Sequence, residues 1–267
     1  TNQKKIMKLL IIGGSGFIGT NLTNFLKKSK IDFLATYSKS KIKNKSNYVR
    51  YNLGNKLPKK IINFEPNVII ASAWHGIPIL DEKNSKININ MYSKFLNELD
   101  KFLFLDKIIF TGSCYEYFIK NNKKNELFEK NQKLSMSHFS IAKNKINSIY
   151  ANYCRKRNIS FIWLRIFFIY GRYQRKDSII PSIINNLKRR KTTFINTPNR
   201  SLDFIHVSDF ILLVKNILID KNILVGSFNC GSGKSYKLSK IYNIISKELK
   251  SKISFEFDAE INDQTVM

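Results

Sequence analysis

A glycine-rich segment near the start of the chain constrains the fold more than any other feature of the sequence. Four apolar residues at positions 9–12 run directly into a segment with glycines at positions 13, 16 and 19, and an amphipathic stretch follows. This order predicts a strand, a tight turn and the start of a helix. Gly13 permits the turn, Gly16 lets the backbone approach a pyrophosphate, and Gly19 lets the helix pack closely on the strand. The segment is therefore predicted to bind a dinucleotide at the N-terminus of that helix.

Apolar runs that alternate with helical patterns indicate the fold class. Runs with strand character occupy residues 8–12, 33–37, 68–72, 107–111 and 159–164. The clearest helix spans residues 138–156, where apolar side chains recur every three or four positions at Ala142, Ile146, Ile149 and Tyr153. This alternation predicts an α/β protein with a Rossmann-type, doubly wound parallel sheet.

The pattern changes after Leu164, where Pro181, Pro198 and several turn signals interrupt shorter segments. We therefore expect a dinucleotide-binding Rossmann domain at residues 1–165. A smaller C-terminal substrate lobe is expected at residues 166–267, partly interleaved with the first domain. The polar, charged stretch 121–133 is expected to be an exposed loop.

The charge of the chain is strongly positive. Lys and Arg outnumber Asp and Glu by 46 to 19, which gives a formal net charge of +27. Such a charge favours polyanionic partners, namely nucleic acid, an anionic membrane surface or phosphorylated small molecules. No nucleic-acid-binding motif accompanies the basic residues, and a general bias toward Lys, Asn and Ile accounts for much of the charge. We therefore expect neither nucleic acid nor a membrane as a partner.

The cysteines and the apolar stretches indicate in which cellular compartment the protein is expected. Cys114, Cys154 and Cys230 are odd in number and far apart, which excludes a full disulfide framework and does not match a zinc site. Buried thiols and no metal are expected. The longest apolar stretch, 159–170, is interrupted by Arg165 and is too short to span a bilayer, and no signal-peptide pattern begins the chain. These features predict a soluble, cytoplasmic protein.

Several motifs, in order and over almost the whole chain, resemble one family. That family is the extended short-chain dehydrogenase/reductases, which act on nucleotide sugars as epimerases, dehydratases and reductases. The matching segments are 13–19 (GGSGFIG), 68–74 (VIIASAW), 111–117 (TGSCYEY), the helix with Lys143, 164–171 (LRIFFIYG), 203–209 (DFIHVSD) and 228–233 (FNCGSG). The residue sequences of segments 111–117 and 164–171 resemble those of enzymes of deoxysugar synthesis. The subgroup that they suggest is the CDP-sugar 4-ketoreductases.

The resemblance implies two catalytic residues and one anomaly. Ser113 is expected to hydrogen-bond the C4 oxygen of the substrate, or else it only caps the turn after its strand. Lys143 is expected to bind the nicotinamide ribose and to hold positive charge near the reacting oxygen, or else it is a surface lysine. Family enzymes carry a tyrosine four residues before that lysine, where this chain has Phe139. Because loss of a general acid or base commonly costs about 10² to 10⁴ in rate, the usual mechanism cannot run unchanged.

Three explanations of Phe139 stay open. Another group supplies the proton, the chain binds its ligands without turnover, or the tyrosine was deliberately replaced to trap a complex. The candidate substitutes are His138, Tyr115, Glu116 and His75, and each has an ordinary structural alternative.

The remaining site residues also follow from the resemblance. The expected cofactor contacts are Gly13, Ser15, Gly16, Phe17, Ile18, Ser38, Lys39, Ala73 and Lys143. The expected substrate contacts are Trp74, His75, Ser113, Cys114, Tyr115, Phe168, Arg172 and Arg200. Arg165 faces substrate phosphates or pairs internally. The arginine that the family places before Asp-Phe-Ile is Leu202 here, and Arg200 lies two residues earlier.

Residues after the second strand bear on the choice of coenzyme. An NAD-preferring site usually has an acidic residue there, but Tyr37 is followed by Ser, Lys, Ser and Lys. These side chains suit a 2′-phosphate, so NADP is expected, with NAD as the alternative. NADP favours net reduction, so we expect reduction of the C4 keto group of a nucleotide-linked 4-keto-6-deoxy sugar. The alternatives are a nucleotide-sugar epimerase or dehydratase and a catalytically silent cofactor-binding protein. The resemblance also implies a homodimer.

Overall fold

The computed structural model describes residues 6–39, 42, 46–117, 127–130, 137–220 and 225–257. The chain forms two compact units. The first unit consists of Thr1–Phe118, Glu129–Ile166 and Ile211–Asn229, and the second consists of Ile119–Phe128, Phe167–Phe210 and Cys230–Met267.

A seven-stranded sheet forms the centre of the first unit, with the strand order β10-β6-β5-β4-β1-β2-β3. The strands are β1 (Lys8–Ile12), β2 (Asp32–Tyr37), β3 (Tyr48–Arg50), β4 (Val68–Ala71), β5 (Lys107–Ser113), β6 (Ser160–Ile166) and β10 (Gly226–Cys230). Neighbouring strands from β3 to β6 pair in parallel. The order reverses on either side of β1, as in doubly wound dinucleotide-binding sheets. The Rossmann-type fold class is therefore confirmed.

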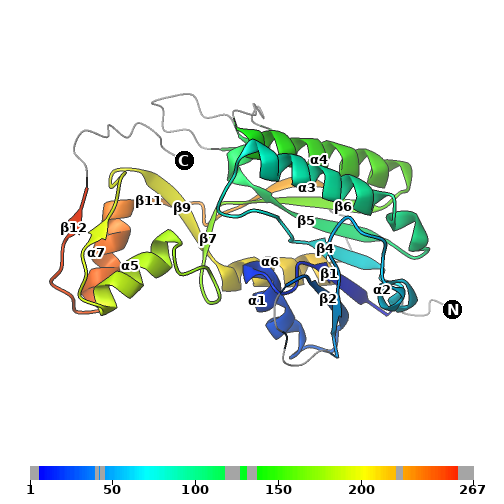
Figure 1. Cartoon of the computed structure of the whole chain (residues 1–267), viewed down its shortest axis with the longest axis horizontal. Coiled ribbons are helices and arrows are strands. Elements are labelled where there is room, and N and C mark those ends of the chain that lie inside the picture. The colour runs from blue at the N-terminus through cyan, green and yellow to red at the C-terminus, as the bar shows by residue number, and fades with distance from the viewer. Residues whose placement is uncertain are drawn as a thin grey trace. The chain divides into compact units, whose positions relative to one another are not determined.

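Helices cover both faces of this sheet. They are α1 (Phe17–Leu26), α2 (Lys59–Phe64), α3 (Glu82–Leu96), α4 (His138–Lys156) and α6 (Val207–Ile219), and α6 enters the first unit at Ile211. Alternate strand residues such as Leu10, Ile69 and Phe110 join one core with buried side chains of α2, α3 and α4. Figure 1 shows α3 and α4 side by side on this face and α1 on the other face.

Local sequence explains how closely most of these elements match the predictions. The predicted helix 138–156 is α4 with the same bounds, and its N-terminus is fixed by a capping box between Ser137 and Ser140. The five predicted strands correspond to β1, β2, β4, β5 and β6 with ends that differ by two residues or fewer. Strands β3 and β10 were missed because β3 has only three residues and β10 reads Gly-Ser-Phe-Asn-Cys, without a continuous apolar run.

The second unit contains two small sheets and two helices. One sheet has the order β11-β9-β7 and the other pairs β12 with β8. The elements are β7 (Phe168–Tyr170), α5 (Ile179–Lys188), β8 (Thr193–Phe194), β9 (Ser201–His206), β11 (Ser235–Lys237), α7 (Leu238–Glu248) and β12 (Phe255–Glu256). Its core is built from Ile183, Leu187, Ile195, Leu202, Leu238 and Tyr242.

Three further predictions concern single features. All three cysteines are buried, as expected. Of the predicted loop 121–133, only residues 127–130 are among the described residues. Within the described ranges, no helix is long and apolar enough to cross a membrane, and no group of three or more His, Cys, Asp or Glu side chains could hold a metal ion.

Candidate active site

The glycine turn after β1 is closely packed. Gly13 has φ +90°, and a Cβ there would lie 2.8 Å from the backbone nitrogen of Ala73. A Cβ at Gly19 would lie 2.1 Å from the carbonyl oxygen of Gly13. A side chain at either position would therefore push the turn away from β4 or from α1. At Gly16 the nearest atom to a Cβ is 3.4 Å away, so this exposed glycine leaves room for a ligand beside the backbone.

The N-terminus of α1 fits the diphosphate of a dinucleotide. Gly16 is the N-cap and, as a glycine, has no side chain that could accept a hydrogen bond from the first turn of the helix. The first turn also carries no acidic residue that would repel an anion. Ser15, Phe17 and Ile18 are half-buried around this end. Unpaired N–H groups and the positive end of the helix dipole make such a terminus a ready anion site.

The end of β2 lies beside the glycine turn. The Thr36 hydroxyl accepts a hydrogen bond from the backbone N–H of Gly13 at 3.0 Å, which ties the two strands together. Ser38 and Lys39 follow β2 and are exposed. Arg50, also exposed, is the register partner of Tyr37 on the neighbouring strand β3. Positions 40 and 41, which also belonged to the predicted basic turn, lie outside the described residues.

The loop after β4 contains three predicted site residues, and two side chains of α3 hold it in place. The Tyr92 hydroxyl donates to the carbonyl of Ala73 at 2.6 Å. The fully buried Asn88 amide accepts from the N–H of His75 at 2.8 Å and donates to its carbonyl at 2.9 Å. Asn88 and Tyr92 were not predicted as site residues, although an asparagine at a core-facing position of a helix is a usable signal because buried amides need partners.

Ser113 ends β5 and begins a single 3-10 turn, η2 (Cys114–Glu116). Its hydroxyl oxygen accepts from the N–H of Tyr115 at 3.2 Å, so the capping role is present. The structure records no acceptor for the O–H of Ser113 among the described residues. Since a hydroxyl has one donor and two acceptor sites, capping leaves that O–H able to donate to a ligand.

Glu116 holds the backbone of Ser113 in place. Its carboxylate is fully buried and accepts from the N–H of Ser113 at 2.8 Å and from the indole N–H of Trp163 at 2.8 Å. A Cβ at Gly112 would lie 2.2 Å from the indole nitrogen of Trp163, so only glycine leaves space for this arrangement. These bonds and an ion pair with an arginine occupy the Glu116 carboxylate. We therefore interpret Glu116 as a structural residue and not as the proton donor.

Arg165 is the partner of Glu116. Its Nε lies 3.1 Å from a Glu116 oxygen, and both side chains are fully buried. The guanidinium also donates to the Tyr117 hydroxyl at 2.6 Å and lies 4.7 Å from the centre of that ring. Of the two alternatives left open for Arg165, the structure therefore shows internal pairing.

Lys143 lies in a cage of aromatic rings. Its side chain is buried, and its ammonium donates to the carbonyl of Thr111 at 2.7 Å. The ammonium is 3.9 Å from the ring centre of Trp74, 5.7 Å from that of Phe139 and 5.9 Å from that of Trp163. Burial lowers the pKa of Lys143 from 10.5 to about 8, and the nearby charge of Glu116 offsets part of that shift. The alternative of an ordinary surface lysine is therefore wrong.

Phe139 lies one helical turn before Lys143 and joins the same cluster. Its ring meets Trp74 edge to face at 5.2 Å and Tyr115 at 6.3 Å. Phe139 is 7% exposed, whereas Tyr115 is 36% exposed. The structure thus brings together Trp74, Ser113, Tyr115, Phe139 and Lys143.

The other predicted residues lie elsewhere. Cys114 is buried at 2% exposure, while His75 and His138 are exposed. Phe168, Arg172 and Arg200 belong to the second unit. The Arg200 Nε is buried and has no hydrogen-bond partner among the described residues. Leu202 is 3% exposed and lies in the core of the second unit.

Comparison with known proteins supplies the family. The model of the NAD dependent epimerase/dehydratase family matches residues 9–231. The chain belongs to this family. Its doubly wound parallel sheet fits that assignment.

Individual relatives of this NAD dependent epimerase/dehydratase family member are distant in sequence but similar in length. A CDP-abequose synthase of Salmonella muenchen is 24% identical over 269 residues, covering 97% of this chain and 87% of the relative. An uncharacterized UDP-glucose epimerase of Bacillus subtilis (strain 168) is also 24% identical, covering 96% of this chain and 86% of the relative.

Solved structures agree on the fold of this family member. UDP-glucose 4-epimerase of Thermotoga maritima, solved with UDP-glucose, superimposes with a TM-score of 0.83 at 17% identity, covering 97% of this chain and 88% of that structure. UDP-N-acetylglucosamine 4-epimerase of Methanobrevibacter ruminantium superimposes with a TM-score of 0.82 at 22% identity, with the same coverage of 97% and 88%.

Proposed function

We propose that this family member reduces the C4 keto group of a nucleotide-linked 4-keto-6-deoxy sugar. The observation that carries the proposal is that the end of β5 bears the Ser113 hydroxyl and also the Thr111 carbonyl that accepts from the buried Lys143 ammonium, at the same end of the parallel strands as the glycine turn. Two relatives bear the names of a CDP-abequose synthase and a UDP-glucose epimerase, which supports a nucleotide-sugar substrate.

The chain's own residues supply binding, charge and a proton. When bound, the nicotinamide coenzyme supplies a hydride for C4. The Ser113 hydroxyl donates a hydrogen bond to the C4 oxygen, and the Lys143 ammonium stabilises the negative charge that develops there. The Glu116 carboxylate holds the backbone of Ser113 in place.

Tyr115 is the candidate that best replaces the missing tyrosine. Its backbone N–H bonds the Ser113 hydroxyl, and its ring contacts Phe139. In the proposed step the Tyr115 phenol gives its proton to the C4 oxygen, which becomes the hydroxyl oxygen of the product. Because Tyr115 is 36% exposed, the phenolate regains a proton from solvent.

NADP is the proposed coenzyme. Lys39 after β2 and Arg50 on β3 are exposed cations near the place where the adenosine ribose of a dinucleotide lies in such sheets. No carboxylate stands among the described residues 37–39 to repel a 2′-phosphate.

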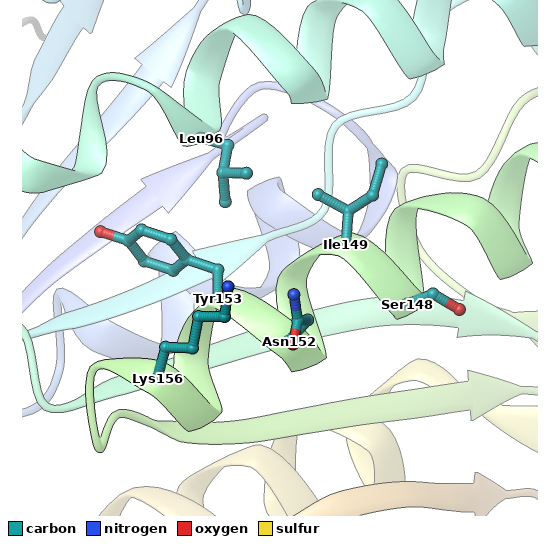
Figure 2. Close-up of a pocket in the computed structure, with 6 residues that line it drawn as sticks. All are labelled: Leu96, Ser148, Ile149, Asn152, Tyr153 and Lys156. Carbon is teal, nitrogen blue, oxygen red and sulfur yellow. The ribbon is translucent and has the colours of Figure 1, made fainter.

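A homodimer also remains a proposal. An open hollow lies on the outer face of α3 and α4, lined mainly by apolar atoms of Leu96, Ser148, Ile149, Asn152, Tyr153 and Lys156 (Figure 2). Light scattering of the wild type and of an Ile149→Asp variant would test whether this face joins two copies, because a buried aspartate would separate them.

One assay tests the reductase. NADPH oxidation is followed by absorbance with CDP-linked, dTDP-linked and UDP-linked 4-keto-6-deoxyglucose. The variants are Phe139→Tyr, Tyr115→Phe and the double variant, with Tyr173→Phe as a control at another exposed tyrosine. We expect Tyr115→Phe to lose about 10² or more in kcat, and Phe139→Tyr to restore activity in its background.

The outcomes separate the candidate functions. If neither the wild type nor Phe139→Tyr oxidises NADPH, the reductase proposal is wrong. Activity only in variants with a tyrosine at position 139 would identify a protein that binds its ligands without turnover. Equal activity of the wild type and Tyr115→Phe would remove Tyr115 as the donor.

A further inference from the structure

Two helices of the second unit end in clusters of basic residues. Lys188 closes α5, and Arg189, Arg190 and Lys191 follow it. The end of α7 carries Lys247, Lys250 and Lys252. All seven side chains are exposed, and within the described residues none of them forms an ion pair. We call these seven residues the basic end.

The topology brings the two clusters to one side of the unit. Helix α5 leads into β8 and α7 leads into β12, and these strands pair in parallel with Thr193 opposite Phe255. The two connecting loops therefore enter the small sheet from the same end. The helices themselves pack together, and Figure 1 shows α5 beside α7.

Composition does not account for the basic end. Seven of the ten residues at positions 188–191 and 247–252 are Lys or Arg, compared with 46 of 267 in the whole chain. Glu248 is the one acidic residue in these ten. The helix dipole explains cations in the last turn, such as Lys188 and Lys247, but the other five lie beyond the helix ends.

Both helices end in the same strained way. Arg190 has φ +56° and Lys250 has φ +52°, each two residues beyond the last residue of its helix. Helix ends usually place glycine or asparagine in this left-handed conformation, because other side chains adopt it at a cost. The chain instead places a basic side chain there twice, on neighbouring loops.

Exposed apolar side chains accompany the cations. Phe194 on β8 is 57% exposed, Phe257 after β12 is 52% exposed, and Leu249 at the C-cap of α7 is 36% exposed. Exposed aromatic rings beside basic side chains are typical of surfaces that lie on anionic membranes, where the cations meet headgroups and the rings enter the interface. Glu256, the register partner of Phe194, and Glu248 on α7 are carboxylates near these side chains in the described part of the chain.

We propose that the basic end attaches the protein reversibly to an anionic lipid surface. The attachment is peripheral, consistent with the absence of a membrane-spanning helix in the described part of the chain. It departs from the expectation, drawn from composition, that no membrane is a partner, because composition does not show where the cations gather. Attraction to acidic headgroups supplies most of the affinity, and the exposed Leu249, which lies between Lys247 and Lys250, and Phe194 add apolar contact. This proposal does not depend on the reductase activity, since none of these residues belongs to the candidate active site.

Vesicle sedimentation tests the proposal with matched charge changes. The full chain is mixed with vesicles of phosphatidylcholine alone or with added phosphatidylglycerol. The test variant carries Arg189→Gln, Arg190→Asn and Lys250→Asn, which keeps residues that tolerate the left-handed conformation at both strained positions. The control variant carries Lys28→Gln, Lys30→Gln and Lys59→Gln, three exposed cations of the first unit. Both variants lose the same net charge.

We expect the wild type to bind only the vesicles with phosphatidylglycerol, and added salt to weaken that binding. The test variant should lose about a hundredfold in partition coefficient, since each cation near such a surface contributes about 1 kcal/mol. The control variant should change by about threefold or less. Urea unfolding of both variants checks that the fold is intact.

Three results would overturn the proposal. The wild type could fail to bind phosphatidylglycerol vesicles. Both variants could lose binding equally, which would mean that the net charge alone drives it. Single-stranded RNA could compete the protein off the vesicles and bind more tightly through the same residues, which would assign the basic end to nucleic acid.

Discussion

Replacing the caged lysine should make the protein more stable at neutral pH while removing its function. Burial lowers the pKa of Lys143 from 10.5 to about 8, so between these two values the unfolded chain binds a proton that the folded chain does not. Stability rises with pH wherever the unfolded state binds more protons. The folded protein therefore bears the full cost of the buried ammonium below pH 8, about 3 kcal/mol at about 1.4 kcal/mol per pH unit. The cost falls as the pH approaches 10.5.

A Lys143→Met variant isolates this contribution. Methionine keeps the length of the side chain but leaves the Thr111 carbonyl without its donor, which costs about 1 to 2 kcal/mol. The net gain at about pH 7 is thus about 1 to 2 kcal/mol. From about pH 7 to about pH 9.5 the free energy of unfolding of the wild type should rise by about 2 kcal/mol relative to that of the variant, because the native lysine loses its proton over this range.

Urea unfolding at the two pH values measures that shift, and Lys145→Met serves as the control because Lys145 is exposed on the same helix. The free energy difference for the control should change with pH by much less than that for Lys143→Met. If the difference in unfolding free energy between Lys143→Met and the wild type is the same at both pH values to within about 0.5 kcal/mol, the reasoning is refuted. Such a result would mean that the ammonium is not desolvated. Lys143→Met should also lose NADPH oxidation. The lysine would then be a residue that lowers stability but is needed for activity.

Three further predictions concern the glycine turn, the buried ion pair and the loop after β4. Gly19→Ala places a Cβ 2.1 Å from the Gly13 carbonyl, so calorimetry should show at least about a tenfold loss in coenzyme affinity; unchanged affinity would argue against binding at this turn. Arg165→Met leaves the buried Glu116 carboxylate unpaired and should cost about 3 to 5 kcal/mol in urea unfolding, whereas a cost under about 1 kcal/mol would show that the pair is not desolvated. Asn88→Ala removes the side chain that holds the loop, so KM for the sugar should rise more than kcat falls, and a purely structural role would change neither.

Much of the candidate site follows from local sequence. The glycine turn, Ser113 at a strand end and Lys143 one turn after Phe139 are defined by spacing within single segments, and short-range geometry places each of them. The residues that support them are Asn88, Tyr92 and Glu116, which act across distances of 3 to 19 residues along the chain. Trp74 and Lys143 are 69 positions apart, and only packing of the β4 loop against α4 reveals their contact. No spacing rule connects such pairs.

The sequence by itself determined the parallel sheet, the glycine turn and the presence of a phenylalanine one helical turn before Lys143, because repeating apolar patterns and single residue identities are local properties. Tertiary structure decided the protonation environment of Lys143, the internal pairing of Arg165 and the meeting of two basic loops at one end of the second unit. The reason is physical: desolvation, ion pairing and surface charge density depend on distances between atoms that lie far apart along the chain. Those distances exist only once the strands have paired and the helices have packed on them.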